Sequence, residues 1–196
     1  MPVFEDERGT YIFNANDLCM IEHIPELVEA GVDSFKIEGR MKSLHYVASV
    51  VKTYRQAVDS FFENPEGWEC RDEWKEELSK VSHRKYTTGF FFGKPNFDGY
   101  NYSEAKYYRS SELVGKIIKY EPDKGMALVQ QKNKFSVGDI VEILGPVGDP
   151  IKIKITEMKN AEGEPITEAP HPEQLVYIPV SVPVEENYIV RKPIAE

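Results

Sequence analysis

The chain has 196 residues, of which 41% are hydrophobic and 29% are charged, values typical of a soluble globular protein of one or two domains. Its net charge of −9 at pH 7 argues against a protein that coats nucleic acid by bulk electrostatics, because such proteins are normally basic. No apolar run reaches the length of a membrane span and the N-terminus lacks a signal-peptide pattern, so we expect a cytoplasmic protein without a membrane partner.

Alternating strands and helices are predicted for the first 60 residues. β-forming residues at 9–15 and again at 33–38 predict two strands. Between them, Asn16 or Asp17 can cap a helical turn. This order is typical of an α/β domain with parallel strands, but two such units are too few for a whole domain. We therefore expect an incomplete α/β part.

The helices of this part have recognisable ends. A turn is expected at 18–23 and a helix at 25–30, since Pro25 suits a first helical turn and Gly31 a C-terminal cap. Ser43 can cap a long amphipathic helix. Apolar residues at helical spacing predict its buried face, namely Leu44, Val47, Ala48, Val51, Tyr54, Val58 and Phe61.

Residues 65–111 are predicted to be a helical and aromatic linker. A helix is expected over 72–83, with Trp74, Leu78 and Val81 on one face. The following stretch, RKYTTGFFFGKPNFDGYNYSE, is rich in aromatic residues and glycine and predicts irregular structure.

From residue 112 onward the hydrophobic pattern has a period of two. Six short strands are expected, separated by Gly, Pro, Asp and Asn turns. A closed barrel would remove their exposed edges. The predicted fold is therefore α/β plus all-β, with an α/β part at 1–64, the linker at 65–111 and a small six-stranded antiparallel β-barrel at 112–196.

Four charged residues lie within residues 35–43, at the end of the predicted strand and just after it. If Phe35 and Ile37 pack on helices, Lys36 and Glu38 point into the interior of an α/β barrel, and Arg40 and Lys42 follow on the loop. Such a group could bind a carboxylate or phosphate and move protons. A structural ion-pair network is an equally good interpretation of this spacing.

Four further residues have side chains that suit a functional site. Asn14 ends a predicted strand and could reach the rim of the barrel, whereas Asp17 is better explained as a helix cap. Cys19 falls in a first helical turn, where backbone N–H groups favour a thiolate and metal ligation, although a small buried hydrophobe explains it as well. Cys70 has no predicted role, and two cysteines make no disulfide framework.

Several longer motifs together resemble one protein family. The segments NDLC, IPEL, GVDSFKIEGRMKS and YRQAVD make residues 3 to about 60 similar to peptidase family U32, the collagenase-like peptidases. HRKYTTGFFFG and KFSVGDIVEILGP resemble that family's tail and C-terminal barrel, which is similar to the second domain of elongation factor Tu. The resemblance implies the C-terminal part of a modified α/β barrel followed by the small barrel.

The resemblance also implies chemistry that the spacing does not show. Several family members act in oxygen-independent hydroxylation, including 5-hydroxyuridine formation at the tRNA wobble position with prephenate as oxygen donor, and hydroxylation of ribosomal RNA or ubiquinone precursors. Such members hold a four-iron four-sulfur cluster on four cysteines. Three of these would lie upstream of this chain and the fourth corresponds to Cys19, so the chain alone is expected to be iron-free and inactive.

Three hypotheses follow. The first is the C-terminal portion of an RNA-hydroxylating enzyme, with tRNA or rRNA and a second U32 subunit as partners. Its catalytic residues would be Lys36, Glu38 and Arg40, and its substrate-binding residues Asn14 and Lys42. The second hypothesis is a collagenase-like peptidase, although the sequence contains no nucleophile–base or metalloprotease motif. The third is a non-catalytic barrel that binds RNA or protein.

Overall fold

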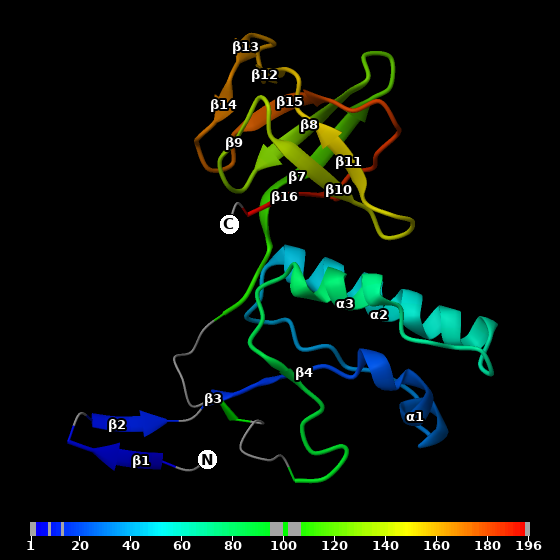
Figure 1. Cartoon of the computed structure of the whole chain (residues 1–196). Helices are drawn as coiled ribbons and strands as arrows, with labels where there is room; N and C mark the ends of the chain where they lie inside the picture. Colours follow the sequence, from blue (N-terminus) through cyan, green and yellow to red (C-terminus); the bar gives the residue numbers. More distant parts are fainter. Residues whose placement is uncertain (1–2, 8, 13, 95–99, 102–106, 195–196) are drawn as a thin grey trace. The chain divides into compact units, whose positions relative to one another are not determined.

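The computed structural model describes residues 3–7, 9–12, 14–94, 100–101 and 107–194. The chain divides into two compact units (Figure 1). The first comprises Met1–Arg40 and Thr53–Arg109, and the second comprises Met41–Lys52 and Ser110–Glu196. No helix in the described part of the chain is long and apolar enough to cross a lipid bilayer.

Within the described residues, the strands of the first unit are short and form three separate pairs. Each pair brings together two stretches of backbone, and only the third is parallel. The pairs are β1 (Val3–Asp6) with β2 (Gly9–Ile12), β3 (Asn14–Ala15) with β6 (Tyr100–Asn101), and β4 (Asp17–Leu18) with β5 (Tyr86–Thr87).

The strand predicted at 33–38 is absent, so this prediction was wrong. Residues 32–39 have no regular secondary structure and pair with no strand in the described part of the protein. A β-strand needs a neighbour for its N–H and C=O groups, and the sequence pattern alone does not supply one. The expected alternation is nevertheless present, since Phe35 and Ile37 are half-buried whereas Lys36 and Glu38 are exposed.

The first helices begin and end close to the predicted residues. The 3₁₀ turn η1 (Ile21–His23) leads into α1 (Ile24–Glu29), which has Pro25 in its first turn. At its C-terminal end Gly31 has φ +80° and donates its N–H to Val28 O, while Val32 N–H donates to Leu27 O. These two bonds form a Schellman motif, which confirms the predicted glycine cap.

Two longer helices follow. In α2 (Leu44–Glu63) the backbone N–H of Tyr46 donates to Ser43 Oγ at 3.2 Å, which confirms the serine cap. In α3 (Asp72–Ser79) the residues Trp74 and Leu78 are buried. Val81, just after that helix, is also buried, so the predicted apolar face of this segment is confirmed.

The buried face of α2 differs from the prediction at its N-terminal end. Leu44, Val47 and Val51 are 47%, 37% and 46% exposed, whereas His45 and Ser49 are buried. This polar face is buried because it belongs to the second unit, where it contacts a charged side chain of the sheet. Hydrophobic spacing alone does not reveal such a polar contact.

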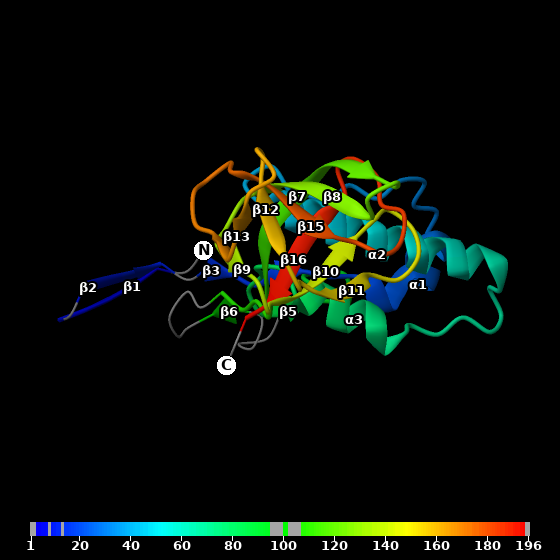
Figure 2. The same ribbon diagram turned by 90° about the horizontal axis from the view of Figure 1, so that it is seen from above.

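Most of the second unit is one antiparallel sheet that curls around an apolar core (Figures 1 and 2). Its strand order is β11-β10-β16-β7-β8-β15-β12-β13, and β9 and β14 form a separate pair. The strands are β7 (Ser111–Glu121), β8 (Met126–Gln131), β9 (Phe135–Ser136), β10 (Ile140–Leu144), β11 (Ile151–Lys154), β12 (Met158–Asn160), β13 (Pro165–Ile166), β14 (Glu168–Ala169), β15 (Leu175–Pro179) and β16 (Ile189–Pro193).

This sheet corrects the predicted closed barrel of six strands. It has eight strands, and its outer strands β11 and β13 are not paired with each other in the described residues. One expected strand at 150–159 is divided into β11 and β12, because residues 155–157 leave the ladder. The all-β character of this part is confirmed, and its likeness to an elongation-factor barrel stays a prediction.

The strand β16 is covered on both faces. Val190 belongs to the apolar core, while Arg191 is fully buried and pairs with Glu142 at 2.8 and 2.9 Å. The same guanidinium lies 3.3 Å from His45 Nε2 and 3.2 Å from Ser49 Oγ. One buried cation therefore joins β16, β10 and the start of α2.

Removing the anion from this contact should destabilise the second unit strongly. We expect Glu142→Gln to lower the free energy of unfolding by about 3 kcal/mol, because it leaves Arg191 buried beside a neutral amide. Amide exchange of β16 and β7 under mild denaturant would measure the change.

A matched control is the neighbouring pair of Glu112 and Lys192. These side chains are 3.5 Å apart and partly exposed, so Glu112→Gln should cost less than about 1 kcal/mol. Equal, small effects of the two substitutions would show that the buried pair is not a stabilising contact.

Candidate functional site

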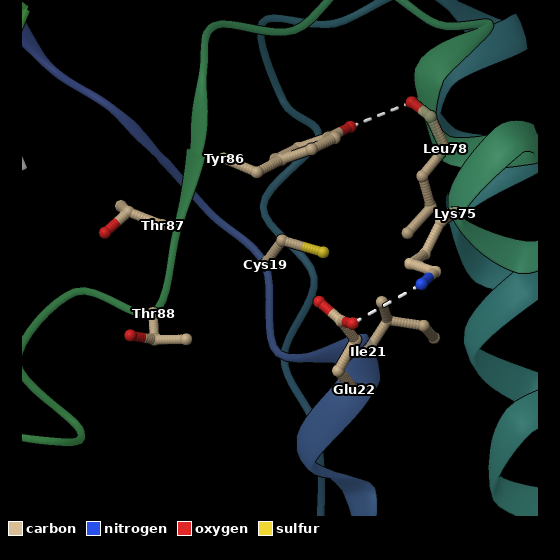
Figure 3. A pocket seen from close by; sticks show the side chains of 8 residues that line it. All are labelled: Cys19, Ile21, Glu22, Lys75, Leu78, Tyr86, Thr87 and Thr88. Carbon is tan, nitrogen blue, oxygen red and sulfur yellow. Dashed lines mark hydrogen bonds and ion pairs between the residues drawn. The ribbon is translucent and has the colours of Figure 1, made fainter. Parts of the chain in front are cut away.

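The first unit contains a pocket of about 240 Å³ beside Cys19 (Figure 3). The residue Cys19 follows β4 directly, and its N–H donates to Thr87 O at 2.9 Å, so it continues the parallel pairing with β5. The opposite wall comes from α3. The pocket is lined by Cys19, Ile21, Glu22, Lys75, Leu78, Tyr86, Thr87 and Thr88.

A partly buried ion pair holds the two strands that position the cysteine. Asp17 accepts hydrogen bonds from the backbone N–H and from Nε of Arg84, at 3.0 and 2.9 Å, and lies 2.8 Å from Nη2. The interpretation of Asp17 as a helix cap was therefore wrong, because η1 starts later and has no side-chain cap. The carboxylate fixes the register of β4 and β5 instead.

The sulfur of Cys19 accepts hydrogen bonds from two directions. The Tyr54 hydroxyl, from α2, donates to Sγ at 3.7 Å, and the backbone N–H of Ile21 also donates to it. Burial is the larger influence and raises the pKa of the Cys19 thiol, while both hydrogen bonds act in the opposite direction. Partial burial therefore favours the neutral thiol, while two hydrogen-bond donors face the sulfur.

Opposite charges meet at the pocket wall. Lys75 Nζ lies 3.5 Å from Glu22 and 2.8 Å from Asp72. Its hydrogen bond to Asp72 is the main reason that the pKa of Lys75 is raised, and Glu22 adds to this effect. For Cys70, burial and then the charge of Glu22 raise the thiol pKa, and Cys19 contributes as well, so the second cysteine lies in the same electrostatic environment.

The predicted catalytic residues lie elsewhere in the first unit. Lys36, Glu38 and Arg40 are exposed on the irregular segment 32–40, and none of them lines the pocket. The side chain of Glu38 accepts the N–H of Arg40 at 2.9 Å. The structure therefore does not place them inside a barrel, and their catalytic role stays a prediction.

The predicted substrate-binding residues are also outside the pocket. The Lys42 ammonium lies 5.0 Å from the centre of the Tyr46 ring, a cation–π distance. Asn14 is paired through its backbone with Asn101, and its side chain lies outside the described residues.

Sequence reasoning missed Tyr54, Lys75 and Tyr86 as residues around Cys19. The signal for Tyr54 was present, because it lies on the predicted buried face of the long helix and a buried tyrosine hydroxyl needs a partner. Spacing could not identify that partner, which is 35 residues away.

No group of three or more His, Cys, Asp or Glu side chains in the described residues could hold a metal ion. Cys19 lines the pocket as a single free thiol. A sulfur that receives two hydrogen bonds and borders a pocket fits the role of a thiolate ligand, since such bonds stabilise its negative charge.

In comparisons with known proteins, both parts of the chain match models of one protein family. Residues 3–101 match peptidase family U32, and residues 109–191 match the C-terminal domain of the same family. The chain belongs to peptidase family U32. The predicted resemblance is thus confirmed, and it covers both the segment with Cys19 and the curled sheet of this U32 chain.

The relatives of this U32 chain carry two kinds of name. It is 35% identical over 97% of its length to tRNA hydroxylation protein P1 of Bacillus subtilis, and 40% identical over 96% to tRNA hydroxylation protein P of Escherichia coli. It is 29% identical over 93% to a collagenase of Porphyromonas gingivalis. The chain spans 45%, 41% and 49% of these relatives, less than half of each.

The raised pKa of Cys19 predicts slow modification of this thiol in the U32 chain alone. Iodoacetamide reacts with the thiolate, which is scarce at pH 7.5 when burial favours the neutral thiol. We expect the alkylation rate, followed by peptide mass spectrometry, to rise steeply above pH 9. A rate at pH 7.5 equal to that of an exposed cysteine in an unfolded control would contradict this prediction.

Proposed function

We propose that this U32 chain acts as the C-terminal portion of an enzyme that hydroxylates RNA without molecular oxygen, forming 5-hydroxyuridine at the tRNA wobble position. The observation that carries the proposal is the similarity along 96–97% of the chain to two proteins named for tRNA hydroxylation. The position of Cys19 is compatible with it, because its sulfur borders a pocket and accepts two hydrogen bonds.

We further propose that Cys19 is one ligand of a four-iron four-sulfur cluster. Such a cluster, when bound, supplies one-electron transfer. The chain's own residues bind and orient this ligand: β5 accepts the Cys19 N–H through Thr87 O, and the hydroxyl of Tyr54 and the amide of Ile21 hold the sulfur. The remaining three thiolates would come from residues outside this chain.

Prephenate is the proposed oxygen-donating co-substrate. The charged side chains of residues 36–42 are the groups proposed to bind it. Guanidinium and ammonium groups such as those of Arg40 and Lys42 suit carboxylates and phosphates, and Glu38 can move a proton. Lys36 would share this role, and Asn14 would add a polar contact. Because Lys36, Glu38 and Arg40 are exposed, they are accessible for such contacts.

tRNA or rRNA and a second U32 subunit are the proposed macromolecular partners, in the cytoplasm. The net charge of −9 disfavours RNA binding by bulk electrostatics, so RNA contact would depend on local basic groups. The curled sheet is a candidate for this contact, given its expected likeness to the barrels of translation factors.

A peptidase is the second candidate function. It is favoured by the family's name and by the 29% identity to a collagenase. Incubation of the full-length protein with collagen, beside a preparation from cells that lack it, tests this function. A third candidate is a non-catalytic module that binds RNA or protein through the curled sheet.

The main proposal is tested in cells that lack the full-length protein. Mass spectrometry of wobble nucleosides should show loss of 5-hydroxyuridine, and the wild-type protein should restore it. Lys36→Met and Glu38→Gln should fail to restore it, while the melting temperature stays unchanged because both side chains are exposed. Unchanged 5-hydroxyuridine in the deletion strain would refute tRNA hydroxylation, and full rescue by both variants would refute the role of these residues.

The cluster is tested with a pair of cysteine variants. In the full-length protein purified without oxygen, Cys19→Ala should lose the iron–sulfur absorption and bound iron, because a cubane needs four thiolates. Cys70→Ala is the matched control and should keep both. If Cys19→Ala keeps its iron, the ligand role of this residue is wrong, and the packing cost alone would be on the order of 1 kcal/mol.

A further inference from the structure

The hydroxyl of Tyr54 occupies an unusual position at the candidate site. It lies 2.8 Å from the backbone N of Met20 and 3.7 Å from Sγ of Cys19. One oxygen atom on α2 thus contacts two successive residues of the turn between β4 and η1. These contacts join parts of the first unit that are 34 and 35 residues apart in the chain.

The direction of the two hydrogen bonds follows from the chemistry of a phenol. A tyrosine hydroxyl has one proton and oxygen lone pairs that accept. The Met20 amide can only donate, so it uses a lone pair of the oxygen, and the phenolic proton is directed to the sulfur. A bond accepted by the oxygen also polarises its O–H group and strengthens the bond that it donates.

We propose that Tyr54 is a positioning residue that holds Cys19 and sets the reduction potential of the cluster through its O–H···S bond. This inference rests on the proposed ligand role of Cys19. A metal-bound thiolate carries no proton, so the phenol is the donor in that state. A donor aimed at a ligand sulfur stabilises negative charge, and therefore favours the reduced form of a cluster.

The surroundings make this bond effective. Met20 is buried and Cys19 is half-buried, so the bond between the hydroxyl and the sulfur is partly shielded from solvent. The backbone amide of Ile21 donates to the same sulfur but cannot be removed by a side-chain substitution. Tyr54 is thus the side chain through which the hydrogen bonding of the sulfur can be changed.

The experiment compares two Tyr→Phe variants in the anaerobically purified full-length protein. Tyr54→Phe removes only the oxygen that bonds Cys19 and Met20. Tyr86→Phe is the matched control, because its hydroxyl belongs to the same pocket but donates to Leu78 O at 2.8 Å. Iron content, circular dichroism and the reduction potential, from a redox titration followed by electron paramagnetic resonance, are measured for both variants and the wild type.

We expect Tyr54→Phe to shift the potential to a more negative value at full iron content, and Tyr86→Phe to match the wild type. Loss of iron in Tyr54→Phe alone, with unchanged circular dichroism, also supports the proposal, because the hydroxyl is then needed to hold the ligand. A wild-type potential in an iron-loaded Tyr54→Phe protein would overturn it, as would equal loss of iron in both variants. A wild-type protein without iron would refute the ligand role of Cys19, and with it both proposals.

Discussion

A fully buried arginine determines how the second unit is arranged. Arg191 has no contact with solvent, so its charge and its N–H groups require partners inside the protein. Glu142 on β10 supplies the charge, and Ser49 and His45 on α2 supply further contacts. The helix therefore turns a polar face toward the sheet, and its apolar residues Leu44 and Val47 remain exposed.

The contact also explains why β16 departs from simple alternation. Ile189, Val190 and Arg191 are all buried, because the apolar core covers one face of the strand and the start of α2 covers the other. The register with β7 shifts between Val190 and Arg191. A strand that is covered on both faces can place an apolar and a charged residue side by side.

Local features were predicted well from the sequence. Gly31 and Ser43 act within a few residues, through a backbone conformation and a cap, and both appear as expected. The strand at 33–38 and the number of strands in the sheet were not predicted correctly, because strand pairing depends on partners far away in the chain. The prediction of the buried face of α2 was wrong at its N-terminal end for the same reason, since Arg191 is 142 residues from Ser49.

At the candidate site, too, local features were predicted from the sequence and contacts between distant residues were not. Cys19 was recognised through a family motif, whereas its own sequence context left a buried hydrophobe as an equal explanation. Tyr54 and Lys75 could not be assigned to it, because only the folded chain brings α2 and α3 to the turn after β4. Asp17 looked like a helix cap and instead pairs with Arg84, again a distant residue.

The place of β16 in the sheet has a consequence for synthesis on the ribosome. This strand lies between β10 and β7, and it joins the β10–β11 hairpin to the other five strands of the sheet. Residues 111–179 can therefore be complete while the sheet is still in two pieces, each with an unpaired edge. At roughly 5–20 residues per second, several seconds pass between the emergence of β10 and that of β16. During this interval the nascent chain exposes two unpaired strand edges. These edges are suitable binding sites for a chaperone.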